Sequence, residues 1–401
     1  MTDMGLIKDI AISTPTKIVM LVIDGLGGLP DPVTGRTELE TARLPNLDAL
    51  AAKGICGMAD PIAPGITPGS GPGHLALFGY DPVECNIGRG VLEAVGIDIE
   101  LQPGDVAARG NFCTINDKGI ITDRRAGRIS TEKCMELCGR LDGMSIDGVD
   151  IAVYPVREHR FVVIFHGRDL AADVTESDPS RTGVAALAVN ALSPAAKKLE
   201  DVANKFAGKS KEILADHRPA NMILLRGFAG KPDFPSMQEI YKLNPLAIAV
   251  YPMYRGLARL VGMEVAKTGT TVEDEFATLK EYYARYDFFF LHVKWTDSAG
   301  EDGDFARKVK VLEQVDAALP GLIGLEPDVL VVTGDHSTPA VIKGHSWHSV
   351  PLLICSEYCR TDPVKAFSES AFITGGLGGI RSTDIMPLAM ANAQKLSKFG
   401  A

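Results

Sequence analysis

The chain has 401 residues, of which 46% are hydrophobic and 23% charged, a composition that fits an ordinary globular protein and excludes a disordered one. Its formal net charge of −10 argues against non-specific nucleic-acid binding, which requires an excess of Lys and Arg. A small anionic ligand is not excluded, because a local arginine cluster matters more than the overall charge. The length exceeds what one hydrophobic core usually supports, so we expect two domains.

The cysteine content and the N-terminal sequence bear on the compartment. Seven cysteines, without a C-x-x-C pair, fit a reducing environment. The N-terminal segment lacks the basic stretch and apolar run of a signal peptide, and no run approaches ~18 apolar residues. We therefore expect a cytoplasmic protein without a membrane span, and we leave open whether it forms a homo-oligomer.

The N-terminal part of the chain is predicted to contain a strand, a helix, a loop and a second helix. Lys17–Ile23 is an apolar strand, and Thr41–Gly54 carries leucines at helical spacing. His74–Gly79 reads as the start of the second helix. The pattern then changes, because Ile97–Leu101 alternates between apolar and polar residues and Asp105–Thr114 resumes this β pattern after a turn.

The rest of the chain shows two further patterns. A mixture of short strands and helices up to about residue 230 predicts an α+β domain, and a strand–helix alternation after it predicts a parallel sheet. The expected strands are Asn111–Ile115, Ile151–Pro155, Phe161–Phe165, Ala247–Tyr251, Asp287–Leu291, Asp328–Thr333 and Val350–Ile354, and the expected helices are Thr131–Leu141, Pro194–Phe206, Thr271–Arg285 and Gly303–Ala318.

Acidic and imidazole side chains follow three of the apolar strands. Asp24 comes directly after the first strand, Asp297 follows the strand that ends at residue 291, and Asp335-His336 follows the strand that ends at residue 333. His345 comes nine residues after His336. Ligands of parallel α/β sheets gather at the carboxyl ends of the strands, and carboxylates with imidazoles suit Zn²⁺ or Mn²⁺. The pattern therefore predicts a two-metal site for phosphoryl chemistry.

These ligands come from both ends of the chain and must meet, so the two ends are predicted to form one domain. The expected core domain comprises residues 1–97 and 240–401, and the expected inserted domain comprises residues 98–239. Two other histidines, His292 and His348, are assigned by default to structural or surface roles, since a lone histidine usually has one.

Ser70 lies in a glycine-rich segment before a predicted helix. The segment reads Thr-Pro-Gly-Ser-Gly-Pro-Gly-His over residues 67–74. Exposed amides and a helix dipole suit a phosphate, although a flexible Gly/Ser loop is the alternative. It is not a Walker loop, because no Gly-Lys-Ser/Thr is present. The glycines after Asp24 do not make a dinucleotide fingerprint, because Pro30 stands where a third glycine is required.

Taken together, the sequence resembles the cofactor-independent (2,3-bisphosphoglycerate-independent) phosphoglycerate mutases of the alkaline phosphatase superfamily, in their shorter archaeal-type branch. The resemblance runs nearly end to end. It implies an α/β fold with an alkaline-phosphatase-like, mostly parallel sheet flanked by helices, and an inserted smaller α+β substrate-binding domain. The motifs that carry it are VIDGLGG (residues 22–28), GSGPGHLALFGYDP (69–82), GDVAARGNF (104–112), DRRAGR (123–128), KWTDSAGEDGD (294–304) and TGDHSTP (333–339).

The resemblance implies a role for each candidate residue. Ser70 would be the nucleophile that becomes phosphoserine. The cofactors would be two divalent cations, Mn²⁺ or Zn²⁺ with Mg²⁺ as a further candidate, and no 2,3-bisphosphoglycerate. The implied ligands are Asp24, Ser70, Asp335 and His336 for one cation and Asp297, Glu301 and His345 for the other.

Glu301 is the main departure from the family, which usually has histidine at this position. A carboxylate can ligate Mn²⁺ or Zn²⁺, so the site could persist with altered metal preference. The alternative is a solvated charge in an acidic loop. Two smaller departures are Ser180, where the family has the histidine of Asp-Pro-His, and Gly344, where an aspartate commonly precedes the metal-binding histidine.

The expected function is interconversion of 2-phosphoglycerate and 3-phosphoglycerate, an isomerase reaction of glycolysis and gluconeogenesis. The substrate is then a small phosphorylated three-carbon acid. Planar guanidinium groups suit its carboxylate and phosphate, although each such residue could equally belong to a solvated basic surface. The candidate substrate-binding residues are Arg124, Arg125, Arg128, Arg157, His159, Arg160 and Lys294.

Two other functions are considered. A metal-dependent phosphatase or phosphonate-processing hydrolase could use the same core, and only the length of the insert and the DRRAGR motif favour the mutase. A metal-depleted homologue that serves as a binding protein is suggested by Glu301. The intact set of Ser70, Asp24, Asp335 and His336 weighs against this last function.

Overall fold

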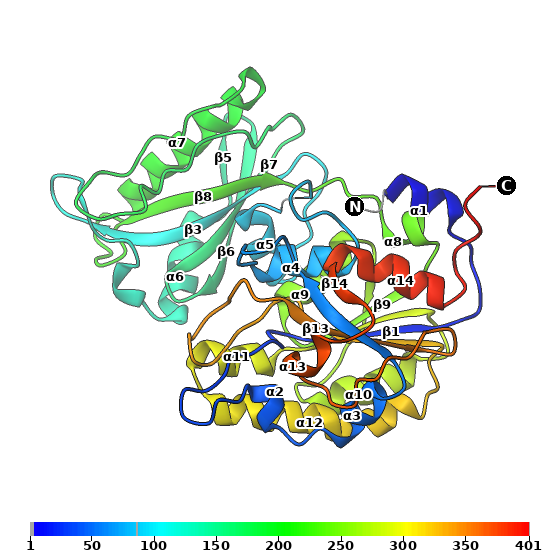
Figure 1. Cartoon of the computed structure of the whole chain (residues 1–401). Helices are drawn as coiled ribbons and strands as arrows, with labels where there is room; N and C mark the ends of the chain where they lie inside the picture. The colour runs from blue at the N-terminus through cyan, green and yellow to red at the C-terminus, as the bar shows by residue number, and fades with distance from the viewer. Residues whose placement is uncertain (1–3, 86, 401) are drawn as a thin grey trace. The chain divides into compact units, whose positions relative to one another are not determined.

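The computed structural model describes residues 4–85 and 87–400 (Figure 1). The chain divides into two compact units, one made of residues 1–86 and 234–401 and the other of residues 87–233. The sequence predicted these divisions at residues 97/98 and 239/240. The first boundary differs because α5 (Arg89–Gly96), which precedes the change in sequence pattern, packs against the sheet of the second unit.

The first unit is built on an eight-stranded sheet in the order β10-β9-β11-β1-β12-β13-β2-β14. Only β13 runs antiparallel to its neighbours, so the predicted mostly parallel sheet is confirmed. No helix separates β12 from β13, so this connection lacks the crossover that a parallel pair requires. The strands are β1 (Ile18–Ile23), β2 (Ile55–Asp60), β9 (Pro245–Ala249), β10 (Glu264–Val265), β11 (Phe288–Val293), β12 (Val329–Thr333), β13 (Val350–Ser356) and β14 (Gly378–Arg381).

Helices cover both faces of this sheet (Figure 1), and every residue of β1, β11 and β12 is buried. Strands buried on both faces read as continuous apolar runs, which explains why these three were recognisable in the sequence. The helices of the first unit are α1 (Met4–Ile10), α2 (Glu38–Thr41), α3 (Pro45–Ala51), α4 (Ser70–Leu77), α8 (Met237–Tyr241), α9 (Pro252–Leu260), α10 (Val272–Tyr282), α11 (Trp295–Asp302), α12 (Phe305–Ile323), α13 (Glu369–Phe372), α14 (Ile385–Asn392) and the 3-10 turn η3 (Ser382–Asp384).

Several predicted elements need correction. The single helix expected at residues 41–54 is two helices, because Pro45 lacks an N–H donor and instead begins the second one. The helix expected to start at His74 begins at Ser70, which follows the N-cap Gly69. No strand forms at residues 97–101, where Asp98 adopts a left-handed conformation with φ of 61°. The helix α11 was not predicted.

The second unit is an α+β fold, as predicted. It is built around an antiparallel sheet. Its strands follow the order β4-β3-β7-β6-β5, and β8 pairs with the other edge of β3. The two strands expected at residues 105–114 and 111–115 are one continuous strand, β3. The elements are β3 (Val106–Ile115), β4 (Ile121–Asp123), β5 (Met144–Ile146), β6 (Val149–Arg157), β7 (Arg160–His166), β8 (Met222–Gly230), α5, α6 (Thr131–Leu141), α7 (Lys197–Ile213), η1 (Ala126–Arg128) and η2 (Pro194–Ala196).

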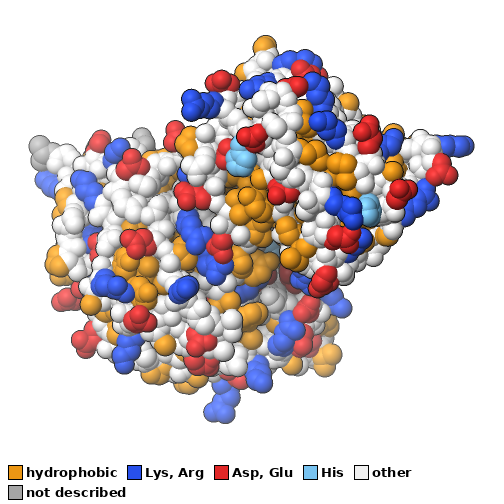
Figure 2. Space-filling view, turned by 180° about the vertical axis from the view of Figure 1, so that it is seen from behind, with side chains coloured by type: hydrophobic (Ala, Val, Ile, Leu, Met, Phe, Trp, Pro, Cys, Tyr) orange, Lys and Arg blue, Asp and Glu red, His pale blue; other side chains and the backbone are white. Residues whose placement is uncertain are grey.

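Two surface properties bear on function. In the described part of the chain, none of the helices has the length and apolar character needed to cross a bilayer. Figure 2 shows one face on which basic and acidic side chains are interspersed. This mixture fits the net charge of −10 and differs from the basic stripe typical of proteins that bind nucleic acid.

Candidate functional site

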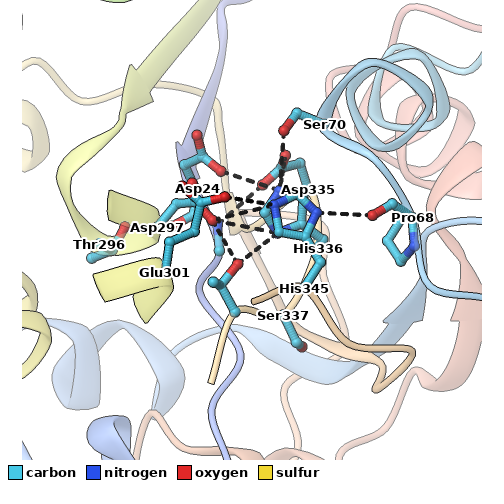
Figure 3. Close-up of polar contacts among 12 residues, drawn as sticks. Asp24, Pro68, Ser70, Thr296, Asp297, Glu301, Asp335, His336, Ser337 and His345 are labelled. Atoms are coloured by element: carbon cyan, nitrogen blue, oxygen red, sulfur yellow. Dashed lines mark hydrogen bonds and ion pairs between the residues drawn. The ribbon is translucent and has the colours of Figure 1, made fainter. Parts of the chain in front are cut away.

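Three adjacent strands bring the candidate ligands to one edge of the sheet. The central strand β1 pairs in parallel with β11 and β12, with Ile23 opposite Val293 and Val22 opposite Thr333. The segments that follow these strands therefore emerge side by side and carry Asp24, Asp297 and the pair Asp335-His336. All four of these side chains are buried. The sequence predicted that these residues share the carboxyl edge of a parallel sheet. The structure places them at that edge (Figure 3).

The first ligand group consists of Asp24, Asp335 and His336, whose candidate ligand atoms all lie within 4.8 Å of one another. His336 Nε2 is 3.4 Å from Asp24 Oδ1 and 3.1 Å from Asp335 Oδ2. Both carboxylate oxygens of Asp24 and Oδ2 of Asp335 are buried without a hydrogen-bond donor. Such oxygens are costly unless positive charge meets them, and the nearby ammonium of Lys294 lies 3.1 Å from Asp24 Oδ2 alone, so the group fits a further cation. We call it the first group.

Ser70 is the first residue of α4, and its Oγ is 3.4 Å from His336 Nε2. The helix approaches closely because Gly73 has no side chain; a Cβ there would lie 2.4 Å from the carbonyl oxygen of Asp335. The glycines of this segment thus allow contact between the helix and the ligand loop. Ser70 is part of a regular helix, not of a flexible loop, and its hydroxyl faces the first group (Figure 3).

The second group consists of Asp297, His336 and His345, again with one ligand atom each within 4.8 Å. His345 Nε2 is 3.6 Å from Asp297 Oδ1, and the two imidazole rings stack with centroids 3.7 Å apart. His345 Nδ1 donates to the carbonyl of Pro68 at 2.9 Å, which leaves Nε2 free to face Asp297. Thr338 Oγ1 donates to Asp297 Oδ1 at 2.6 Å and lies 2.9 Å from His336 Nδ1.

Glu301 lies at the edge of the second group. It follows Asp297 by one turn of α11, and its Oε1 is 3.8 Å from His345 Nε2. Its side chain is 55% exposed, whereas that of Asp297 is 1% exposed. Partial burial and the charge of Asp297 raise the pKa of Glu301. Glu301 is thus beside the second group but outside the 4.8 Å spacing that defines it.

Lys294 lies between the two groups. Its Nζ is 2.5 Å from Asp297 Oδ2 and 3.1 Å from Asp24 Oδ2. Burial alone would lower the pKa of Lys294, but the two carboxylates raise it, so the ammonium stays charged. Lys294 was predicted only as a substrate-binding residue, and the structure shows that it forms ion pairs with two of the candidate ligands.

The carboxylates of the two groups change one another's pKa. Burial and the charges of Asp24 and Asp297 raise the pKa of Asp335 well above its usual range. Burial also acts to raise the pKa of Asp24, but contacts with His292 and Lys294 hold it well below the usual range. Three buried carboxylates beside one ammonium leave an excess of negative charge, which bound divalent cations would neutralise.

Two buried histidines that the sequence analysis did not place at the site lie behind the first group. His292 Nε2 is 3.4 Å from Asp24 Oδ2, and His74 Nδ1 is 3.2 Å from Asp335 Oδ2. Burial lowers the pKa of each imidazole to about 4, so both are neutral near pH 7. Tyr254 packs against both rings. The default structural role given to His292 was therefore incomplete. One signal was available: His292 is the only polar residue in the apolar run of β11.

The second unit holds the remaining six predicted substrate-binding residues. Arg124 makes a bidentate contact with Asp178, at 3.0 Å from Nε and 2.6 Å from Nη2. His159 is buried, and burial together with Arg160 lowers its pKa to about 4. The remaining residues, all exposed, are Arg125, Arg128, Arg157 and Arg160.

Three further arginines of this unit, Arg89, Arg109 and Arg226, were not among the predicted substrate-binding residues. Arg109 Nε is 3.3 Å from Glu93 Oε1, and Arg226 Nη1 is 3.7 Å from Asp178 Oδ2. Burial lowers the pKa of Arg109, and the charges of Arg160, Arg89 and Arg226 act in the same direction. Arg109 lies within the GDVAARGNF motif, which was the signal that could have identified it.

A parallel sheet whose strand ends present carboxylates and imidazoles in two overlapping groups is characteristic of metal-dependent α/β enzymes. Comparison with known proteins gives the family. The model of the family "2,3-bisphosphoglycerate-independent phosphoglycerate mutase" matches residues 51–221. A probable 2,3-bisphosphoglycerate-independent phosphoglycerate mutase of Thermotoga neapolitana is 51% identical over 397 residues, which cover 98% of both chains. One from Thermus thermophilus is 48% identical over 400 residues, again 98% of both chains.

Solved structures agree with the sequence matches. A protein from Pyrococcus horikoshii has a TM-score of 0.82 at 31% identity, covering 96% of this chain and 99% of its own. The cofactor-independent phosphoglycerate mutase of Thermoplasma acidophilum has a TM-score of 0.76 at 30% identity, covering 94% of this chain and all of its own. The chain therefore belongs to the 2,3-bisphosphoglycerate-independent phosphoglycerate mutase family, as its motifs predicted, and the alternative of a phosphatase or phosphonate-processing hydrolase is not favoured.

Proposed function

We propose that this chain interconverts 2-phosphoglycerate and 3-phosphoglycerate, with Ser70 as the nucleophile and two divalent cations as cofactors. The observation that carries the proposal is the position of Ser70 Oγ, 3.4 Å from His336 Nε2 at the start of α4 and beside two groups of ligands. Membership of the mutase family supports the same reaction.

The donor sets support cation binding in each group. The first group offers carboxylate oxygens that lack donors together with an imidazole, and the second offers Asp297 with His345. Mixed oxygen and nitrogen donors suit Mn²⁺ or Zn²⁺ better than Mg²⁺, which prefers oxygen alone. Bound cations would lower the pKa of the Ser70 hydroxyl and neutralise charge on the phosphoryl group. We propose Ser70 as a further ligand of the first cation and Glu301 as a ligand of the second.

The reaction consists of two transfers through Ser70. In the first, Ser70 Oγ loses its proton and bonds to phosphorus, the bond from phosphorus to one glycerate oxygen breaks, and that oxygen is left as a hydroxyl. In the second, the other glycerate hydroxyl attacks the phosphoserine and restores the Ser70 hydroxyl. No atom is gained or lost overall. The N–H groups of Ser70 and Gly71 at the start of α4 and the ammonium of Lys294 can hold the phosphoryl group during both steps.

The basic residues of the second unit are proposed to bind the substrate. The exposed guanidinium groups can form bidentate contacts with a carboxylate or phosphate. Arg124 already contacts Asp178, so we expect it to orient its neighbours more than to bind the substrate itself. The proposed binding residues are Arg125, Arg128, Arg157 and Arg160, with His159 beside them. A cytoplasmic location is proposed because the substrate belongs to glycolysis.

Phosphorus NMR on the full-length protein tests the proposal. The protein is stripped with a chelator, reloaded with Mn²⁺ or Zn²⁺, and mixed with 3-phosphoglycerate. We expect 2-phosphoglycerate to form in the reloaded samples and neither product to form in the stripped sample. Free phosphate as the main product would identify a phosphatase, and full mutase activity in the stripped sample would contradict the role of the cations.

A further inference from the structure

A lysine is buried beneath the loops that carry the candidate ligands. Lys308 lies in α12 and is fully buried, although lysine is almost never fully buried without partners. Its Nζ donates to the carbonyl oxygens of Gly27 at 3.0 Å and Thr338 at 2.9 Å, and it lies 3.7 Å from Glu38 Oε1. One carboxylate and two carbonyls thus compensate its charge.

Both carbonyls belong to the loops that supply the ligands. Gly27 follows Asp24 by three residues, and Thr338 follows His336 by two. The side chain of Thr338 also contacts the site, because its hydroxyl donates to Asp297 Oδ1 and lies against His336 Nδ1. Lys308 is therefore linked through the backbone to ligands of both groups while touching none of them.

Two glutamates extend this network. Glu38 Oε1 accepts from the backbone N–H of Ala340 at 2.8 Å, in the loop after His336. Glu369 Oε1 accepts from the N–H of Gly28 at 2.8 Å, in the loop after Asp24. Both loops are thus held by charged side chains that lie outside the ligand groups.

The loop after Asp24 is tightly packed. A Cβ at Gly27 would lie 1.9 Å from Ser337 Oγ, and a Cβ at Gly28 would lie 1.9 Å from Glu38 Oε2. The two loops also bond directly, since the N–H of Thr338 donates to the carbonyl of Gly27 at 3.1 Å. Tight packing and this direct bond hold the loops close together, and Lys308 adds one hydrogen bond to each loop.

We propose that Lys308 is a positioning residue, whose ammonium holds the loop after Asp24 and the loop after His336 at the separation that both ligand groups require. The inference rests on the proposed function in one respect, namely that the groups bind divalent cations. A buried charged pair is weak evidence for stability, because apolar replacements are often as stable. What an apolar side chain cannot supply is two directed bonds to two loops.

A second buried lysine provides a matched control. Lys395 is also fully buried, donates to the carbonyl of Thr14 at 2.8 Å and lies 3.3 Å from Asp287 Oδ2. Thr14 precedes β1 and Asp287 precedes β11, so these contacts lie at the opposite edge of the sheet from the site. Six residues of strand separate the two edges by ~20 Å.

The experiment compares Lys308→Met with Lys395→Met in the full-length protein stripped of metal. Thermal unfolding establishes that each variant is folded, and calorimetric titration measures the affinity for Mn²⁺. We expect Lys308→Met to weaken Mn²⁺ binding by ~10–100-fold, the range seen when support of a ligand is lost, and Lys395→Met to bind as the wild type does. If Lys308→Met does not fold, Lys308→Met/Glu38→Gln replaces it, because this double variant also removes the charge of the carboxylate that lies 3.7 Å from the Lys308 ammonium.

The outcomes separate this inference from the proposed function. If the folded Lys308 variant binds Mn²⁺ as tightly as the wild type, the inference about Lys308 is overturned and the proposed function is not. Equal weakening in both lysine variants would also overturn it, because the effect would then be a general loss of rigidity. A wild-type protein that binds no Mn²⁺ would overturn both proposals.

Discussion

The two ligand groups share His336 but differ in their surroundings. In the first group, Asp24 and Asp335 lie within two residues of the ends of β1 and β12, and every member is fully buried. In the second, Asp297 comes from a helix and His345 from a loop, with the side chain of His345 21% exposed. The first group is therefore enclosed by protein, whereas part of the second is open to solvent.

This difference fits the departure from the family that the sequence predicted at Glu301. An extra negative charge would be costly in the first group, where burial already raises the pKa of Asp335. At the position of Glu301, where the side chain is 55% exposed, water can solvate the carboxylate when it is not bound to a cation. We therefore expect substitutions in the first group to impair function more than substitutions at the edge of the second group.

The largest effect is expected for Ser70→Ala. Turnover should fall by at least ~10³-fold, since covalent catalysis is lost. The fold should persist, because Ser70 is only partly buried at the first residue of α4. The phosphorus NMR assay measures turnover, and circular dichroism checks the fold. Near-normal mutase activity in the alanine variant would rule out Ser70 as the nucleophile.

A smaller effect is expected for His292→Phe. The phenyl ring preserves the packing against Tyr254 but removes the contact with Asp24. Mn²⁺ affinity should fall by ~10–100-fold, as when a ligand loses its supporting contact. His348→Phe is the control, because His348 contacts Ser346 and stacks on Trp347 instead of the ligands. Equal affinities in the two variants would show that His292 does not support Asp24.

The smallest effect is expected at Glu301. Glu301→His should preserve or raise activity and shift the preference toward Zn²⁺, because imidazole is a borderline-soft neutral donor. Glu301→Ala should weaken binding to the second group and leave the first group less affected. Metal titrations of the wild type and both variants, compared with turnover, test this. Three indistinguishable curves would mean that Glu301 is a solvated charge and not a ligand.

Much of the site was predictable because buried parallel strands have a simple sequence pattern. Continuous apolar runs marked β1 and β12, and the polar residues after them, Asp24 and Asp335, could then be assigned to one edge. The helix α11 escaped prediction because its eight residues include too few apolar positions to show a helical period. Asp297 within it was nevertheless selected, because it closely follows the apolar run of β11.

The residues that support the ligands were not predictable in the same way. His292 stands out as the polar residue of β11, but whether a histidine in a fully buried strand faces a ligand depends on the register of the neighbouring strands, which the sequence does not show. Lys308 lies in a helix among other charged residues, where the sequence suggests a solvated lysine. Its burial results from the packing of α12 against α2, α3 and α11, which are distant or unpredicted elements.

The central claim is that the two groups hold two cations in one centre. Anomalous scattering from a crystal of the full-length protein loaded with Mn²⁺ tests it most directly. We predict two peaks roughly 3.5–4 Å apart, one bound by Asp24, Asp335 and His336 and the other by Asp297 and His345. A single peak, or peaks away from these residues, would contradict the account.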